Sequence, residues 1–358
     1  MNILEKNSCV ALLVALVAPA VGCGSDASDD GADPAVTTTE NLNCTSNEYV
    51  AFDSANHANQ DIRLATYAEM NDLMKDGDFD AAKALYLDAD GSANLQEKVQ
   101  GRVDEHMAAA PLQGDRMDAT VMAWLDVGAA SDDELVQGVA KQWVDKTLGE
   151  FVYLSVHHET LAGARKNWDE ALGYYGSSTD NAEGDLRGLA ATAAKRDGNN
   201  GTTLETDIFN NLILGACELD GALGAEAESI EDLGSVPELQ AVVEDVDTAM
   251  LEVLAYSAGH EAIGMQEKLA AAELDTDGLI IKAAELAAFF LPLERVMQER
   301  GGDSAARAQE IRDAIDSMVE FDPATPDFGD VTWMDDLGDA PQMIIDNLQV
   351  EFDIDIRA

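Results

Sequence analysis

The chain has 358 residues, 46% apolar and 25% charged, which suits one large or two small globular domains and excludes wholesale disorder. Against 70 Asp and Glu it carries only 21 Lys and Arg, so the net charge of −49 excludes nucleic-acid binding through a basic patch. Such a charge indicates either a surface suited to a salty medium or an acidic surface that collects cations.

Residues 1–22 are predicted to be a lipoprotein signal peptide. Residues 10–20 are almost wholly apolar but too few to span a bilayer stably, which is typical of a secretory signal. The following Ala20-Val21-Gly22-Cys23 resembles a bacterial lipobox, which implies lipidation of Cys23. Ordinary cleavage, giving a soluble secreted protein, is the alternative. By resemblance to the sorting rule, Gly24 implies an outer-membrane lipoprotein, facing the periplasm or the cell exterior.

Residues 23–48 are expected to form an acidic, flexible tether, because Gly, Ser, Asp and Thr dominate them. The chain has four cysteines, of which Cys9 lies in the signal and Cys23 is the lipid anchor. Cys44 and Cys217 remain, in an oxidising compartment, and either form a disulfide or stay separate thiols. The sequence has no C-x-x-C, which argues against a thiolate zinc site.

Residues 49–320 are predicted to form one all-α bundle, and residues 321–358 an acidic tail with a short docking helix near 343–348. Apolar residues recur at helical spacing throughout, and no β-alternation of any length occurs. Ser131 and Glu134 read as a capping box that opens a long helix. Residues 279–298 are the most apolar and are expected at the centre. The expected helices are 53–75, 79–87, 95–110, 116–127, 131–167, 168–175, 182–195, 203–219, 237–272, 279–298 and 305–319.

The segment 167–176, NWDEALGYYG, is distinctive. It resembles the W-D-E-A-F-G-Y hallmark of a domain family of bacterial cell-surface lipoproteins without an assigned activity. Weaker similarity over 63–70, 209–216 and 284–289 extends the resemblance to about residues 51–319. The resemblance implies that the motif includes Trp168, Gly173, Tyr174 and Tyr175. Their helical spacing indicates that they pack in the core of the bundle.

The architecture also resembles, more distantly, the imelysin-like helical bundles, which are tied to metal or haem uptake and to a peptidase. Their G-x-H-x-x-E motif is absent, because none of the five histidines has Glu three residues later. The W-D-E-A-F-G-Y family tends to carry histidine just before the motif Trp and one turn before the late Glu, where this chain has Lys166, Asn167 and Ile281.

His158 is the first candidate ligand, because it lies on the same apolar helix face as Leu154 and Leu161, with His157 at the edge. Metal sites in bundles draw side chains from several helices, so His158 would need partners from facing helices. A buried histidine that only packs in the core is the alternative. The candidate partners are Glu159, Glu170, His260, Glu261 and Glu285.

Glu261 falls on the apolar stripe of Leu254, Ala258 and Met265, where a carboxylate should be buried. A buried carboxylate must be paired, hydrogen-bonded or protonated. Pairing with Arg295 or Lys282 is as good an interpretation as a metal, and Glu285 has the same two readings. In the motif, Asp169 and Glu170 are either a ligand-binding carboxylate pair or helix caps.

Three functions are compatible with these residues. The first is a lipid-anchored, non-enzymatic module that binds a cation, such as a divalent metal ion, or a small ligand through carboxylates. The second is a structural or interaction lipoprotein, and the third an imelysin-like metal-dependent peptidase. No nucleophile elbow, phosphate loop or dinucleotide fingerprint occurs, which favours a non-enzymatic role. The membrane, reached through lipid on Cys23, is the one partner predicted, and no nucleic acid is expected.

Overall fold

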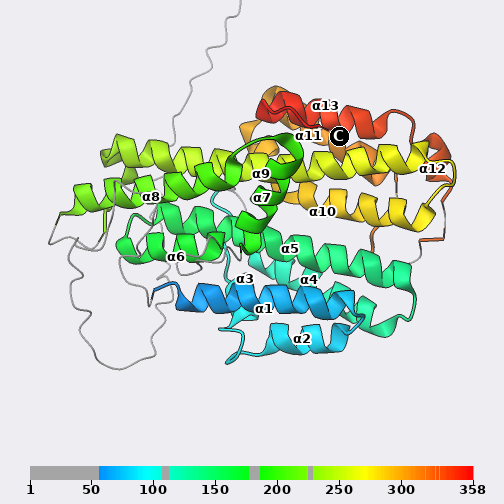
Figure 1. The fold of residues 1–358 in the computed structure, drawn as a ribbon, viewed down its shortest axis with the longest axis horizontal. Coiled ribbons are helices and arrows are strands. Elements are labelled where there is room, and N and C mark those ends of the chain that lie inside the picture. Colours follow the sequence, from blue (N-terminus) through cyan, green and yellow to red (C-terminus); the bar gives the residue numbers. More distant parts are fainter. Residues whose placement is uncertain are drawn as a thin grey trace, which may run out of the picture. The chain divides into compact units, whose positions relative to one another are not determined.

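A computed structural model describes residues 56–106, 113–176, 186–224, 229–318, 320–326, 328–329 and 331–357 (Figure 1). The predicted signal peptide, Cys23, the tether and Cys44 lie outside these residues. Over the described chain the structure is helical and contains no strand, and one isolated bridge joins Ala164 to Ser229. The predicted all-α class is therefore confirmed.

The helices follow the apolar periodicity of the sequence. Their bounds are α1 (Ala58–Lys75), α2 (Phe79–Leu87), α3 (Leu95–Gln100), α4 (Gly114–Ala130), α5 (Glu134–Leu161), α6 (Arg165–Tyr175), α7 (Gly188–Asn200), α8 (Leu204–Leu223), η2 (Leu233–Ser235), α9 (Pro237–Ala270), α10 (Thr276–Arg300), α11 (Gly302–Asp316), α12 (Trp333–Asp336) and α13 (Ala340–Phe352). None of the described helices is both long and apolar enough to cross a membrane.

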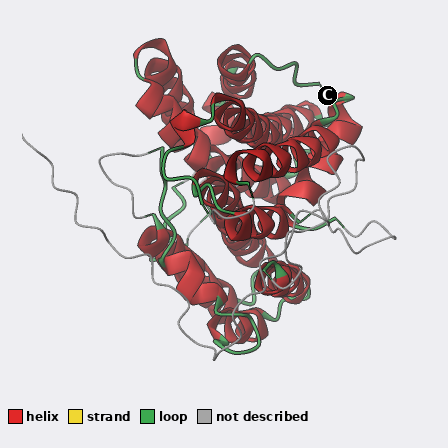
Figure 2. Cartoon of the chain, turned by 90° about the vertical axis from the view of Figure 1, so that its left-hand side faces the viewer, coloured by secondary structure: helices red, strands yellow, loops and turns green. Residues whose placement is uncertain are grey.

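Three long helices, α5, α9 and α10, form the centre of the bundle. Helix α10 packs against both α9 and α5, while α4 and α6 cover α5 and α8 covers α9 (Figure 1). Figure 2 shows the described chain as helices joined by loops, with no strand. As expected, α10 is central, with Leu286 and Phe290 completely buried. Near the C-terminus, α13 packs against α9 and α11, so the predicted short docking helix spans residues 340–352.

Two details at the ends of α5 differ from the prediction. The capping box is wrong: Asp133, not Ser131, is the N-cap, and its side chain accepts from the backbone N–H of Leu135. Ser131 lies two residues before this N-cap, and its Oγ accepts from the backbone N–H of Asp133 at 3.1 Å. The helix also ends at Leu161 instead of Asn167, because the chain bends through Gly163, whose φ is +62°, before α6 begins.

Helix α6 carries the distinctive motif, and its aromatic residues are core. Trp168, Tyr174 and Tyr175 are all 1% exposed or less. Gly173 lies against α1, where an added Cβ would come within 2.8 Å of the Cβ atoms of His57 and Gln60. The predicted packing role of these residues is confirmed.

Cys217 on α8 is disulfide-bonded, which excludes a free thiol there.

Candidate metal centre

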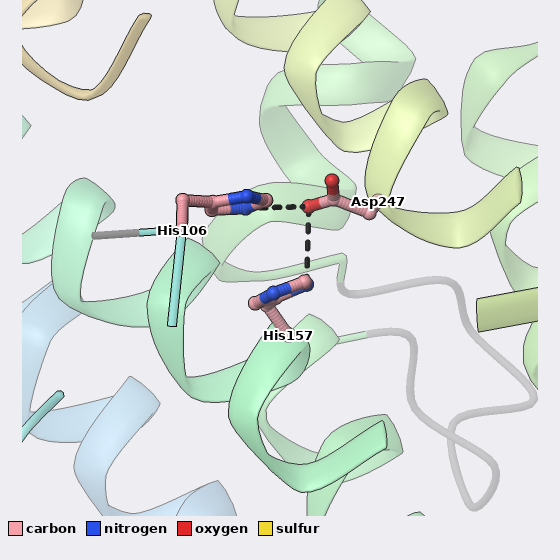
Figure 3. A group of neighbouring side chains, drawn as sticks. All are labelled: His106, His157 and Asp247. Atoms are coloured by element: carbon pink, nitrogen blue, oxygen red, sulfur yellow. Dashed lines mark hydrogen bonds and ion pairs between the residues drawn. The ribbon is translucent and has the colours of Figure 1, made fainter. Parts of the chain in front are cut away.

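Two imidazoles and a carboxylate from distant parts of the chain meet beside α5 (Figure 3). His106 follows α3 and precedes α4, His157 lies on α5, and Asp247 lies on α9. Each offers one ligand atom, and these atoms all lie within 4.8 Å of one another. The side chains of His157, Asp247 and His106 are 9%, 15% and 18% exposed, so the group is largely shielded from solvent.

Both imidazoles bring a nitrogen close to the same oxygen, Oδ1 of Asp247 (Figure 3). His106 Nε2 lies 3.3 Å from this oxygen and His157 Nδ1 lies 3.2 Å from it. The two rings stack, with centroids 4.2 Å apart and planes 16° from parallel. His157 Nδ1 is buried and its contact with Asp247 lacks hydrogen-bond geometry, so this nitrogen has no hydrogen-bond partner among the described residues.

The hydroxyl group of Tyr153 completes the polar shell. It donates to Asp247 Oδ1 at 3.0 Å and lies 2.8 Å from His106 Nε2. Burial, together with the charge of Asp247, holds the pKa of Tyr153 well above its usual value, so the phenol keeps its proton. The hydroxyl therefore acts as a fixed donor that orients the carboxylate.

The charges in the group raise the pKa of His106 and lower the pKa of Asp247. Burial by itself would lower the pKa of His106, but the hydrogen bond and the charge of Asp247 outweigh it, and this pKa is raised. Burial by itself would raise the pKa of Asp247, but hydrogen bonding and the two imidazole charges hold it well below its usual value. Asp247 is therefore an anion, the form in which a carboxyl group binds a metal ion.

A buried ion-pair network holds the backbone at His106. Asp104 accepts the backbone N–H of His106 at 3.1 Å through Oδ1 and the Nε–H of Arg295 at 2.9 Å through Oδ2. Arg295, on α10, also pairs with Glu150 on α5, which Arg116 contacts as well. Asp104 and Glu150 are both 1% exposed, so this network ties the His106 segment to two central helices.

None of the ligands predicted in the motif region belongs to this group. His158 is half-buried and pairs with Glu105, and the buried histidine is its neighbour His157. The predicted assignment of His158 to the apolar face, with His157 at its edge, is thus wrong. Helix α5 is buried almost all round between Glu150 and Thr160, and a single stripe of leucines does not define its inner face there.

The other predicted carboxylates of this region contact nearby side chains. Glu159 accepts from Arg102 at 3.4 Å. Asp169, which is completely buried, accepts from Asn56 at 2.9 Å, and Glu170 lies 3.4 Å from Lys166.

The predicted ligands on α9 and α10 form a separate cluster. Glu261, 1% exposed, pairs with Lys282, one of the two cations that the sequence suggested, and lies 3.6 Å from Arg196. Glu285 pairs with Lys146 at 3.1 Å and with Lys282 at 3.5 Å. His260 is half-buried on the same helix as Glu261. The structure thus does not bring His158, Glu170, Glu261 and Glu285 together at one site.

Sequence reasoning missed His106 and Asp247 altogether. A signal for Asp247 exists: it lies four residues after Val243 and three before Met250, which are both buried, so it is an acid on the inner face of a long helix. His106 carries no comparable signal. The predicted helix 95–110 would have included it, but this prediction is wrong for the described residues, because α3 ends at Gln100 and His106 lies outside any helix.

This set of donors, two imidazole nitrogens and a carboxylate oxygen, suits zinc and similar transition-metal ions and leaves room for a further ligand. Around a tetrahedral zinc ion, neighbouring ligand atoms lie roughly 3.3–3.5 Å apart, given bonds of about 2.0–2.1 Å. The two contacts of Asp247 Oδ1 are close to this spacing. Comparisons of the chain with models of known protein families, with curated proteins and with solved structures find no match.

Proposed function

We propose that this protein is an outer-membrane lipoprotein, anchored through Cys23, whose helical domain binds a divalent transition-metal ion through His106, His157 and Asp247. The observation that carries the proposal is the approach of two imidazole nitrogens, at 3.2 and 3.3 Å, to one buried carboxylate oxygen. The net charge of −49 supports it, because an acidic surface raises the local concentration of cations.

The chemistry of the ligands selects the class of ion. Imidazole nitrogen favours Zn²⁺, Cu²⁺ or Ni²⁺ over Mg²⁺ and Ca²⁺, which prefer oxygen ligands. Because the two rings are nearly parallel, one imidazole has to rotate before both lone pairs point at the same ion. His106 also has to lose the proton that the carboxylate of Asp247 stabilises.

Metal analysis of the full-length chain tests the proposal. The protein would be purified in detergent at high salt without chelator, dialysed to remove loosely held ions, and analysed by mass spectrometry for metals. We expect close to one transition-metal ion per chain, lost in His157→Gln and Asp247→Asn and retained in His260→Gln. A metal retained by His157→Gln but lost in Glu261→Gln would overturn the assignment and favour the carboxylates predicted from the sequence.

A structural or interaction lipoprotein is the second candidate. Its support is the pairing of Glu261 and Glu285 with Lys282 and Lys146, because paired acids are typical of a structural centre. A protein that carries no metal and takes up none when Zn²⁺ is added would favour this candidate and justify a search for protein partners.

A further inference from the structure

A buried arginine on α7 has hydrogen-bonding capacity that the described chain does not use. Arg196 is 2% exposed, and its Nε donates to Ser257 Oγ at 3.0 Å. Its Nη2 lies 3.6 Å from Glu261 Oε1, beyond the length of a good hydrogen bond. Its Nη1 is buried and has no hydrogen-bond partner among the described residues. One edge of the guanidinium, formed by Nη1 and Nη2, is thus poorly satisfied.

The charge of Arg196 is also poorly balanced. Glu261 is the one acid within ion-pair distance among the described residues, and its other oxygen, Oε2, is held by Lys282. Burial, followed by the charge of Glu285, raises the pKa of Glu261, which favours its neutral form. Glu261 is therefore a counterion that Arg196 shares with Lys282, and the buried charge of Arg196 has no described carboxylate at hydrogen-bond distance.

Further cationic and polar groups lie around Arg196. Lys195 is exposed and makes no ion pair with any described residue, and burial and then the charge of Arg196 lower its pKa. Burial lowers the pKa of His260, and so do the charges of Arg196, Lys282 and Lys195. His260 Nδ1 is buried without a hydrogen-bond partner in the described chain. Cationic groups and unused polar atoms thus lie close together here, with Glu261 and Glu285 as the neighbouring acids.

We propose that Arg196, Lys195 and His260 form a binding site for a small oxyanion, a carboxylate or a phosphate, between α7 and α9. The poorly satisfied edge of Arg196, where Nη1 has no partner among the described residues and Nη2 makes only the long contact with Glu261, matches the two oxygens of such a group, which guanidinium binds in a bidentate manner. Exposed Lys195 and half-buried His260 provide the approach from solvent. The site shares no residue with the proposed metal centre and stands whether or not that centre binds metal.

Thermal unfolding of the full-length chain in detergent, at fixed sodium concentration and ionic strength, tests this site. Sodium phosphate and sodium acetate would be titrated separately against sodium chloride, so that general salt effects cancel and the two oxyanions are distinguished. We expect one of them to raise the midpoint of unfolding saturably, as a ligand of the folded state does. Lys195→Gln should weaken the fitted affinity about tenfold, the size expected for one charge-assisted hydrogen bond.

Two further variants separate binding from a general change of charge or fold. Lys83→Gln removes the same charge from α2, where Lys83 pairs with Asp126, and should leave the affinity unchanged. Arg196→Lys keeps the charge but removes the bidentate edge, and should weaken binding even if the protein remains folded. The proposal is overturned if neither oxyanion stabilises the protein more than chloride, or if Lys195→Gln and Lys83→Gln respond alike.

Discussion

Trp168 on α6 lies directly against Gly215 on α8, and a Cβ added to Gly215 would come within 2.0 Å of Cη2 of the indole. The indole is 1% exposed, so neither the ring nor the neighbouring backbone has space to move. The motif tryptophan therefore requires a glycine on the facing helix, and this contact explains the motif as a packing device.

Trp168→Ala should lower the free energy of unfolding by about 3–5 kcal/mol, because it leaves a large cavity. Gly215→Ala should cost about 1–3 kcal/mol through overpacking against the ring. In the double variant the alanine methyl group fills part of the cavity, so the double variant should be more stable than the sum of the two effects predicts. Urea unfolding at high salt measures all three, and strict additivity would contradict the packing interpretation.

The buried network behind the metal centre predicts a positioning role for Asp104, which joins Arg295 to the backbone of His106. Asp104→Asn should weaken Zn²⁺ binding about 10- to 100-fold, the usual effect of a residue that orients a metal ligand. Competition with a chromophoric chelator measures the affinity. Glu351→Gln, which disturbs an ion pair with Arg300 and Arg307, is the control. Equal losses in the two variants would argue against positioning.

The same network predicts how the free energy of unfolding depends on pH. Burial opposes ionisation of Glu150, but the charges of Arg295 and Arg116 outweigh it and hold its pKa below its ordinary value of 4.5. A carboxyl whose pKa is lowered on folding stabilises the protein above its unfolded pKa and loses this contribution as pH falls through the folded pKa. The difference in unfolding free energy between wild type and Glu150→Gln should be constant above about pH 5.5 and shrink below about pH 4.5. A difference that stays constant down to pH 3 would contradict this assignment.

The lipobox predicts that Cys23→Ser releases the protein from membranes, because the serine hydroxyl cannot carry the thioether-linked lipid of a lipoprotein. Fractionation of cells that express wild type or the variant measures the membrane-bound share. Cys217→Ser, which removes a cysteine of the helical domain, is the control and should leave the protein in the membrane fraction. Retention of Cys23→Ser in membranes would refute the lipid anchor.

The helices could be predicted from the sequence because their apolar spacing repeats over many turns. The same periodicity predicts the central position of α10 and the burial of Trp168 and Glu261. The cost of burying a charge predicts that Glu261 needs a partner, but the sequence left open whether that partner is Arg295, Lys282 or a metal. These features can be predicted because each depends only on the spacing of residues along one helix or on the chemistry of one side chain.

The candidate metal centre could not be predicted in the same way. Helix α5 is buried on several sides around His157, so its periodicity does not distinguish His157 from His158. His106 lies outside any helix, and Asp104 and Arg295, the latter 191 residues from Asp104 along the chain, hold its backbone in place. Such a site depends on tertiary distances, about which a single sequence gives no direct information.

The most direct test of the proposed metal centre is zinc X-ray absorption spectroscopy on the full-length chain, loaded with one equivalent of Zn²⁺ at high salt. We predict a first shell of oxygen and nitrogen at about 2.0–2.1 Å, with outer-shell scattering from two imidazoles. His157→Gln should reduce this scattering to one imidazole or none. A shell of oxygen atoms alone in the wild type, as weakly held surface zinc would give, would contradict the proposed centre.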